Sequence, residues 1–121
     1  MKPSDSSYPS EASHTTIAPA VLLTIARLTV LGVPGVAGLA PIPGGVNRLF
    51  RRGLNEGIRV EVDEDAVQFE LHVIIRRQTN ALEVGHRIQA EVAGAVEETV
   101  GMPVSRVDVH IEDVDFGAPA G

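Results

Sequence analysis

The chain has 121 residues and a formal net charge of −6 at pH 7, so it is long enough for one domain and disfavours general affinity for nucleic acid or anionic lipid. It has no cysteine, which excludes disulfide bonds and thiolate metal sites. One tyrosine and three phenylalanines are its only aromatics. The core must therefore be aliphatic, and a base-stacking platform for single-stranded nucleic acid is excluded.

The first residues form a polar segment that precedes a hydrophobic one. Residues 1–14 are rich in serine and lack the apolar run of an export signal, so we expect a disordered tail. A helix is predicted from Pro19 to about Leu31, with Thr15 or Thr16 as its N-cap. Glycine and proline interrupt the apolar stretch soon afterwards, so we expect no direct insertion into a membrane.

This predicted helix is apolar on more than one side. The side that we expect to face the sheet carries Val21, Ile25 and Leu28. The opposite side carries two large aliphatic residues and a charge, namely Leu23, Val30 and Arg27. We predict that this opposite side docks a partner protein or a second copy of the chain. The alternative is that the loop from Pro41 to Arg52 folds back and covers it.

A short strand and a basic cluster follow the helix. Residues 36–40 are predicted as a strand that prolines bring to an end. The loop beyond it carries three arginines, Arg48, Arg51 and Arg52. We interpret this basic cluster as part of a solvated loop. The alternative is a site for a phosphate group, for a nucleic-acid backbone or for an acidic segment of a partner.

Two strands joined by a tight turn come next. Residues 58–63 and 67–75 alternate apolar and polar side chains, the period of strands with one buried face. Glu64 and Asp65 separate them, so an antiparallel hairpin is predicted.

A helix and a last strand complete the predicted fold. The helix runs from Ala81 to Val100, with Asn80 as N-cap and Gly101 at its end. The strand covers residues 107–111, and a strand-helix-strand unit normally closes with its two strands parallel.

These elements predict one two-layer α/β sandwich of the α+β type, with two main helices packed on one face of a mixed three- to four-stranded sheet. We expect this domain over residues 15–116, between disordered tails at 1–14 and 117–121. The side chains expected beneath the helices are Ile58, Val60, Phe69, Leu71, Val73, Val107, Val109 and Ile111.

Two histidines and two glutamates fall on the outward faces of the predicted strands. His72 and Glu70 share one strand, and His110 and Glu112 share the other. If the strands are neighbours, the four side chains converge as ligands for zinc. Because no HxH or HExxH spacing supports a ligand set, we favour a solvated polar face with cross-strand charge pairs, and we predict no metal and no cofactor.

Catalysis has few candidate residues in this sequence. Ser105 is the only serine outside the N-terminal tail, and no nearby histidine and acid identify it as a nucleophile. We therefore predict that the chain is not an enzyme. The alternative is a metal- or anion-binding regulator or enzyme that uses His72 and His110, or the basic cluster of Arg48, Arg51 and Arg52.

The order of these pieces resembles the bacterial alkaline-shock-protein family, which includes the general-stress Gls proteins. The residues that carry the resemblance are Ile17-Ala18-Pro19, Gly35-Val36-Ala37-Gly38-Leu39, Gly57-Ile58-Arg59-Val60-Glu61-Val62, Asn80, Glu83-Val84, Ile88-Gln89, Val92, Ala95-Val96-Glu97, Thr99, Gly101 and Val107-Asp108-Val109-His110-Ile111. They span about Thr16 to Phe116. Ala20 and Leu23 depart from the pattern, because members often carry acidic or polar residues there.

The resemblance implies a non-enzymatic interaction module of the cell-envelope stress response. Members of the family are cytoplasmic, and some are held at the inner face of the membrane by a small membrane-anchored partner. Some members self-associate. The family supplies no catalytic residues to transfer to this chain.

Overall fold

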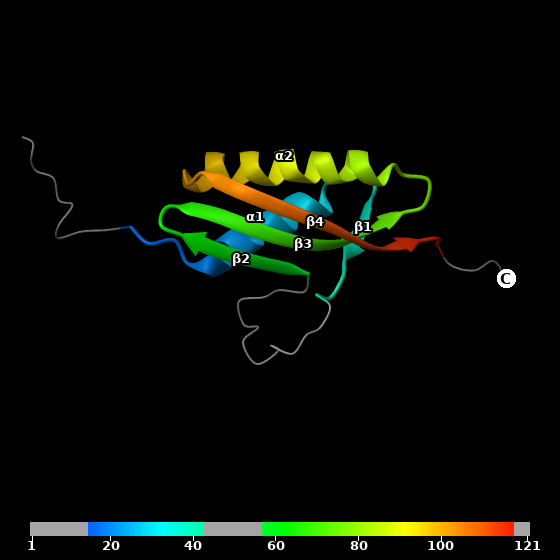
Figure 1. Ribbon diagram of the computed structural model, residues 1–121, viewed down its shortest axis with the longest axis horizontal. Coiled ribbons are helices and arrows are strands. Elements are labelled where there is room, and N and C mark those ends of the chain that lie inside the picture. The colour runs from blue at the N-terminus through cyan, green and yellow to red at the C-terminus, as the bar shows by residue number, and fades with distance from the viewer. Residues whose placement is uncertain (1–14, 43–56, 118–121) are drawn as a thin grey trace, which may run out of the picture.

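The computed structural model describes residues 15–42 and 57–117. In these ranges the elements are α1 (Pro19–Leu31), β1 (Val36–Leu39), β2 (Ile58–Asp63), β3 (Ala66–Arg76), α2 (Ala81–Val100) and β4 (Val104–Asp115). The four strands form one sheet, and α1 and α2 pack together against the same face of it (Figure 1). The predicted two-layer α+β fold is confirmed.

The long strand β3 lies at the centre of the sheet. β4 pairs with β3 in parallel along one edge, as the strand-helix-strand rule predicts. Along the other edge β2 pairs antiparallel with the first half of β3, and β1 pairs antiparallel with its last residues. The sheet is therefore mixed, and β1 and β2 share one edge of the central strand.

The junction between β1 and β2 falls at His72 of β3. The His72 backbone N–H donates to the Gly57 carbonyl and its own carbonyl accepts from the Ala40 N–H, each at 2.9 Å. Gly57 has φ +88°, and a Cβ there would lie 2.5 Å from the Ala40 carbonyl oxygen. Only glycine fits this position, because it has no Cβ and adopts positive φ readily.

Local signals locate most element boundaries. Asn80 caps α2 by accepting a hydrogen bond from the Glu83 backbone N–H at 3.1 Å. Gly101 ends this helix in the left-handed conformation, with φ 78°.

α1 also has its predicted bounds, but its N-cap is Ala18 with no side-chain hydrogen bond. The prediction of Thr15 or Thr16 as the cap was wrong, because α1 begins at Pro19, directly after Ala18, and the Val21 N–H donates to the Ala18 carbonyl at 2.9 Å.

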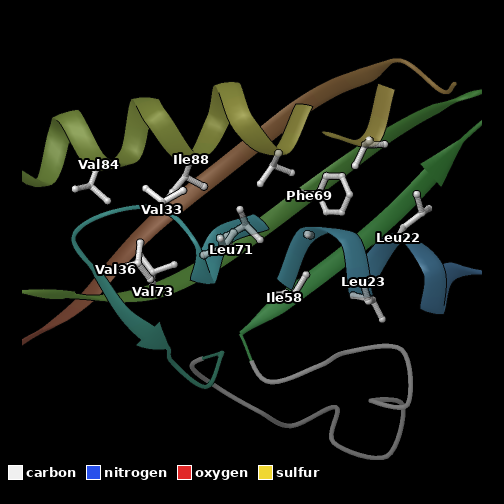
Figure 2. Packing of buried hydrophobic residues seen from close by; sticks show 14 of the residues in the cluster. Leu22, Leu23, Val33, Val36, Ile58, Phe69, Leu71, Val73, Val84 and Ile88 are labelled. Carbon is white, nitrogen blue, oxygen red and sulfur yellow. The ribbon is translucent and has the colours of Figure 1, made fainter. Parts of the chain in front are cut away.

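The core lies between the sheet and the two helices. Phe69 is 2 % exposed, and in Figure 2 its ring lies between α2 and α1. Ile58, Leu71 and Val73 are buried with it, as predicted.

The β4 side chains are covered less well. Val107 and Val109 are half-buried and Ile111 is 36 % exposed, so the prediction of a covered Ile111 was wrong. β4 is an edge strand with a neighbour on one side only.

The rotation of α1 differs from the prediction. Leu23 is 5 % exposed and Val30 is fully buried, whereas Leu28 is 67 % exposed. The side of α1 predicted to face outward is therefore core. The physical reason is that α1 contacts α2 as well as β1 and β2, so a wide sector of the helix is buried. A helix that is apolar on nearly every side gives no periodic signal that selects this sector.

Candidate functional site

The open face of the sheet, away from the helices, brings the four predicted polar side chains together. Alternation along β3 directs Glu70 and His72 to this face. The parallel register pairs His72 with His110 of β4, and Glu112 follows two residues later. The four residues define what we call the His–Glu cluster: Glu70, His72, His110 and Glu112. Their convergence, which the sequence made conditional on neighbouring strands, is confirmed.

His72 is the buried centre of the His–Glu cluster. It is 3 % exposed, although both helices of the described ranges, α1 and α2, lie on the other face of the sheet. Its Nδ1 lies 2.6 Å from Glu112 Oε2, and its Nε2 lies 2.9 Å from Glu70 Oε2. Ionised carboxylates only accept hydrogen bonds, so each contact that forms is donated by a ring N–H of His72. His72 is thus held between two carboxylates, one from β3 and one from β4.

Glu70 is the most connected carboxylate of the cluster. Its Oε1 accepts from Arg59 Nη1 at 3.1 Å, and its Oε2 lies 3.8 Å from His110 Nε2. The hydrogen bond from His72 lowers the pKa of the Glu70 carboxyl below its ordinary value. Partial burial opposes this effect, and the positive charges of Arg59, His72 and His110 reinforce it. Glu70 is therefore a carboxylate at neutral pH.

His110 covers His72 from the outer strand. The two imidazole rings are stacked, with centroids 4.5 Å apart and planes 11° from parallel. The side chain of His110 is itself 48 % exposed. One nitrogen or oxygen ligand atom from each of Glu70, His72 and His110 lies within 4.8 Å of the others, so the cluster has the composition and spacing of a metal-binding group.

Sequence reasoning missed two features of this site. The first is the burial of His72, because alternation predicts a solvated side chain on the open face. The second is the ion pair between Arg59 and Glu70, which the hairpin register could have predicted. Counting outward from the two-residue turn at Glu64 and Asp65 pairs Arg59 directly with Glu70, as observed.

The other candidate residues do not join the His–Glu cluster. Arg27 is exposed on α1, whereas Leu23 and Val30 are core residues. The basic cluster of Arg48, Arg51 and Arg52 lies outside the described residues, as does the rest of its predicted loop.

A hollow beside the cluster does not resemble an enclosed ligand site. It is lined by Arg59, Glu61, Gln68, Phe69, Glu70, Arg106 and Asp108 and holds about 230 Å³. Enclosed ligand sites usually have volumes of about 300–1,000 Å³ and mostly apolar walls. This hollow is smaller, open and polar.

The fold is that of a class of small two-layer α+β domains with known structures. The copper form of the MamM CTD has a TM-score of 0.57 and 14 % sequence identity, and the match covers 84 % of this chain and 91 % of that one. The zinc form of a MamM CTD variant has a TM-score of 0.58 and 15 % identity, covering 82 % and 89 % of the two chains. At these identities the likeness shows the fold alone.

The family is shown by the sequence. The model of the alkaline shock protein 23 family matches residues 7–116, so the chain belongs to this family. The family is described as having a cell envelope-related function. The resemblance to alkaline shock proteins is thereby confirmed. An uncharacterized protein of Bacillus subtilis (strain 168), YloU, is 24 % identical over 95 residues, which are 78 % of this chain and 79 % of YloU. Within residues 15–42 and 57–117, neither helix is long and apolar enough to cross a bilayer.

Proposed function

We propose that this chain is a non-enzymatic protein-interaction module of the bacterial cell-envelope stress response. It acts in the cytoplasm at the inner face of the membrane, where it docks to a small membrane-anchored protein. The family supplies the envelope context. The observation that carries the docking is an exposed apolar stripe on α1, which we call the α1 stripe and define as Val21, Leu28 and Leu31.

The α1 stripe lies on a helix that is already anchored by its opposite side. Leu28 is 67 % exposed, and Val21 and Leu31 are each 43 % exposed. Arg27 is exposed next to Leu28 on the same helix. Fully burying an exposed large aliphatic side chain contributes roughly 1.5–3 kcal/mol, and a partly covered one contributes less. The three side chains together form the docking surface, in place of the predicted pair Leu23 and Val30.

The substitution Leu28→Glu tests this proposal in the native bacterium. We expect the wild-type chain to be crosslinked to a small protein with one apolar span and to be recovered with the membrane fraction. Leu28→Glu should lower this recovery at least tenfold, because a charge replaces a buried aliphatic residue at the contact. Leu82→Glu is the matched control, since Leu82 is 76 % exposed on α2, and it should behave like the wild type.

Sedimentation equilibrium of the purified chain decides between a partner and a second copy. A wild-type dimer that Leu28→Glu dissociates would assign the α1 stripe to self-association. Equal membrane recovery of the wild type and of Leu28→Glu, with native circular dichroism for both, would rule the stripe out.

We further propose that the basic cluster Arg48, Arg51 and Arg52 contacts an acidic segment of the same partner. Charge complementarity makes association sensitive to salt. Raised salt and Arg51→Glu should then both weaken the complex, and a complex that responds to neither would exclude this contact.

A further inference from the structure

We propose that Glu70, His72 and His110 bind a divalent cation of the zinc class on the open face of the sheet, with Glu112 orienting His72. This site is independent of the α1 stripe, which lies on the helix layer. The proposal rests on the composition of the His–Glu cluster, the distances between its ligand atoms and the hydrogen bond that fixes the buried histidine.

The distances between the candidate ligand atoms suit a small tetrahedral ion. Zinc lies about 2.0–2.1 Å from each nitrogen or oxygen ligand, so neighbouring ligand atoms are roughly 3.3 Å apart. His72 Nε2 lies 2.9 Å from Glu70 Oε2, and His110 Nε2 lies 3.8 Å from the same oxygen. These two separations bracket the required value. The ligand atoms of all three residues lie within 4.8 Å of one another, so a movement of His110 brings its nitrogen to the same spacing.

Glu112 supplies the support that a metal-binding histidine normally has. A histidine that binds zinc through one ring nitrogen usually donates its other N–H to a carboxylate or carbonyl group. His72 Nδ1 is 2.6 Å from Glu112 Oε2, which leaves Nε2 as the ligand atom. Because His72 is 3 % exposed, its ring is already oriented by packing as well as by this hydrogen bond. Arg59 plays the same supporting part for the other oxygen of Glu70.

His110 is the ligand that moves. Its ring is nearly parallel to that of His72, and a nitrogen lone pair lies in the plane of its ring, so two stacked rings do not both aim at one ion between them. The side chain of His110 is half exposed on the edge strand, and α1 and α2 pack on the other face of the sheet, so the ring can turn about its side-chain bonds. Two protein ligands are thus in place, a third turns in, and a water completes the coordination.

The ligand set selects the kind of cation. Two imidazoles and one carboxylate suit zinc and its neighbours in the first transition row, whereas calcium and magnesium prefer six or more oxygen ligands. Binding also moves protons. A histidine binds zinc as the neutral imidazole, so protons compete with zinc for the ligand nitrogens and binding weakens as the pH falls.

Calorimetry with zinc chloride on the full chain, freed of metal by a chelator, tests the proposal. We expect one zinc per chain and a rise in the melting temperature with zinc. His110→Ala should weaken binding at least tenfold, since it removes a ligand. Glu112→Gln should weaken it by roughly 10–100-fold, the usual effect of losing a supporting group. Calcium and magnesium should give neither signal.

The matched control uses the two histidines outside the cluster. His86 is exposed on α2 and His14 precedes the described domain, so the double variant His14→Ala/His86→Ala keeps the whole proposed site. It should bind zinc like the wild type. His110 is exposed, so its alanine variant is expected to fold, and circular dichroism checks this.

Three results would overturn the proposal. One is the absence of heat and of a melting shift at zinc concentrations up to about 100 µM, which would saturate a site of micromolar affinity. The second is a folded His110→Ala that binds as tightly as the wild type. The third is loss of binding in the double variant, which would place zinc on the other histidines.

Discussion

The two faces of β3 bury their side chains by different means. On the helix face, Leu71 is fully buried among aliphatic groups. On the open face, the next residue, His72, is 3 % exposed, yet both of its ring nitrogens contact carboxylates. Adjacent residues of one strand are thus both buried. Apolar contact stabilises the buried Leu71, whereas hydrogen bonds to two carboxylates offset the cost of burying the polar His72.

The two faces differ in how strongly each depends on the identity of particular neighbouring side chains. Apolar burial is non-directional and scales with area, so the helix face tolerates exchanges of similar volume. A buried polar group without a hydrogen bond costs about 1–3 kcal/mol, so the open face depends on Glu70 and Glu112 both being in place. The helix face therefore supplies stability, and the open face has the composition of a binding site.

The largest effect is expected on the helix face. Phe69→Ala should lower the free energy of unfolding by about 3–5 kcal/mol, because it removes an aromatic ring from the middle of the core. Urea denaturation measures this change. Leu82→Ala, which truncates an exposed residue, serves as control and should change stability by less than about 0.5 kcal/mol. A loss below about 1 kcal/mol for Phe69→Ala would contradict the assignment of the two faces.

The second effect belongs to the open face and depends on pH. The pKa of Glu70 is lowered in the folded chain, so below the ordinary value of 4.5 the unfolded chain binds this proton first. The stabilisation by Glu70 is complete above that value and is lost as the pH falls through the lower, folded pKa. Urea denaturation between pH 6 and pH 3 should therefore show a steeper loss for the wild type than for Glu70→Gln. Parallel curves would show that the carboxylate gains nothing from His72, His110 and Arg59.

The smallest effect is expected at the rim of the open face. Arg59 and Glu70 form an ion pair at 3.1 Å with side chains 38 % and 29 % exposed. Pairs of this exposure contribute about 0.2–1 kcal/mol, because solvent screens them. Arg59→Ala should cost no more than that, and its cost should decrease in high salt. Arg106→Ala, which breaks the more exposed pair with Asp108, is the comparison and should cost still less. A larger loss at Arg106 would invert the assumed importance of the two pairs.

Much of the candidate site could be predicted from local patterns. The alternation of β3 and of β4 placed Glu70, His72, His110 and Glu112 on one side of the sheet, and the strand-helix-strand unit made the two strands parallel neighbours. Alternation predicts on which face of the sheet a side chain lies, but it does not predict how exposed that side chain is to solvent. It could not show that the side chains around His72 would exclude solvent, because that depends on the register, which pairs His72 with His110.

In the helix layer, too, a local sequence pattern does not always predict which side chains are buried. α2 has a single stripe of Val84, Ile88, Val92 and Val96, and all four are buried. Its bounds and its buried side follow from spacing and capping. α1 is apolar on nearly every side, so spacing predicted its bounds correctly and its rotation wrongly.

The sequence by itself determined the elements, their order and the polarity of each strand face, because these depend on residues a few positions apart. Caps, turns and apolar periods act over that range. Which side of α1 is covered, and how deeply His72 is buried, follow from the tertiary structure. The first depends on α2, which packs against α1, and the second depends on β4, which pairs with β3 at His72. Both elements lie far along the chain and exclude water only after the fold has formed.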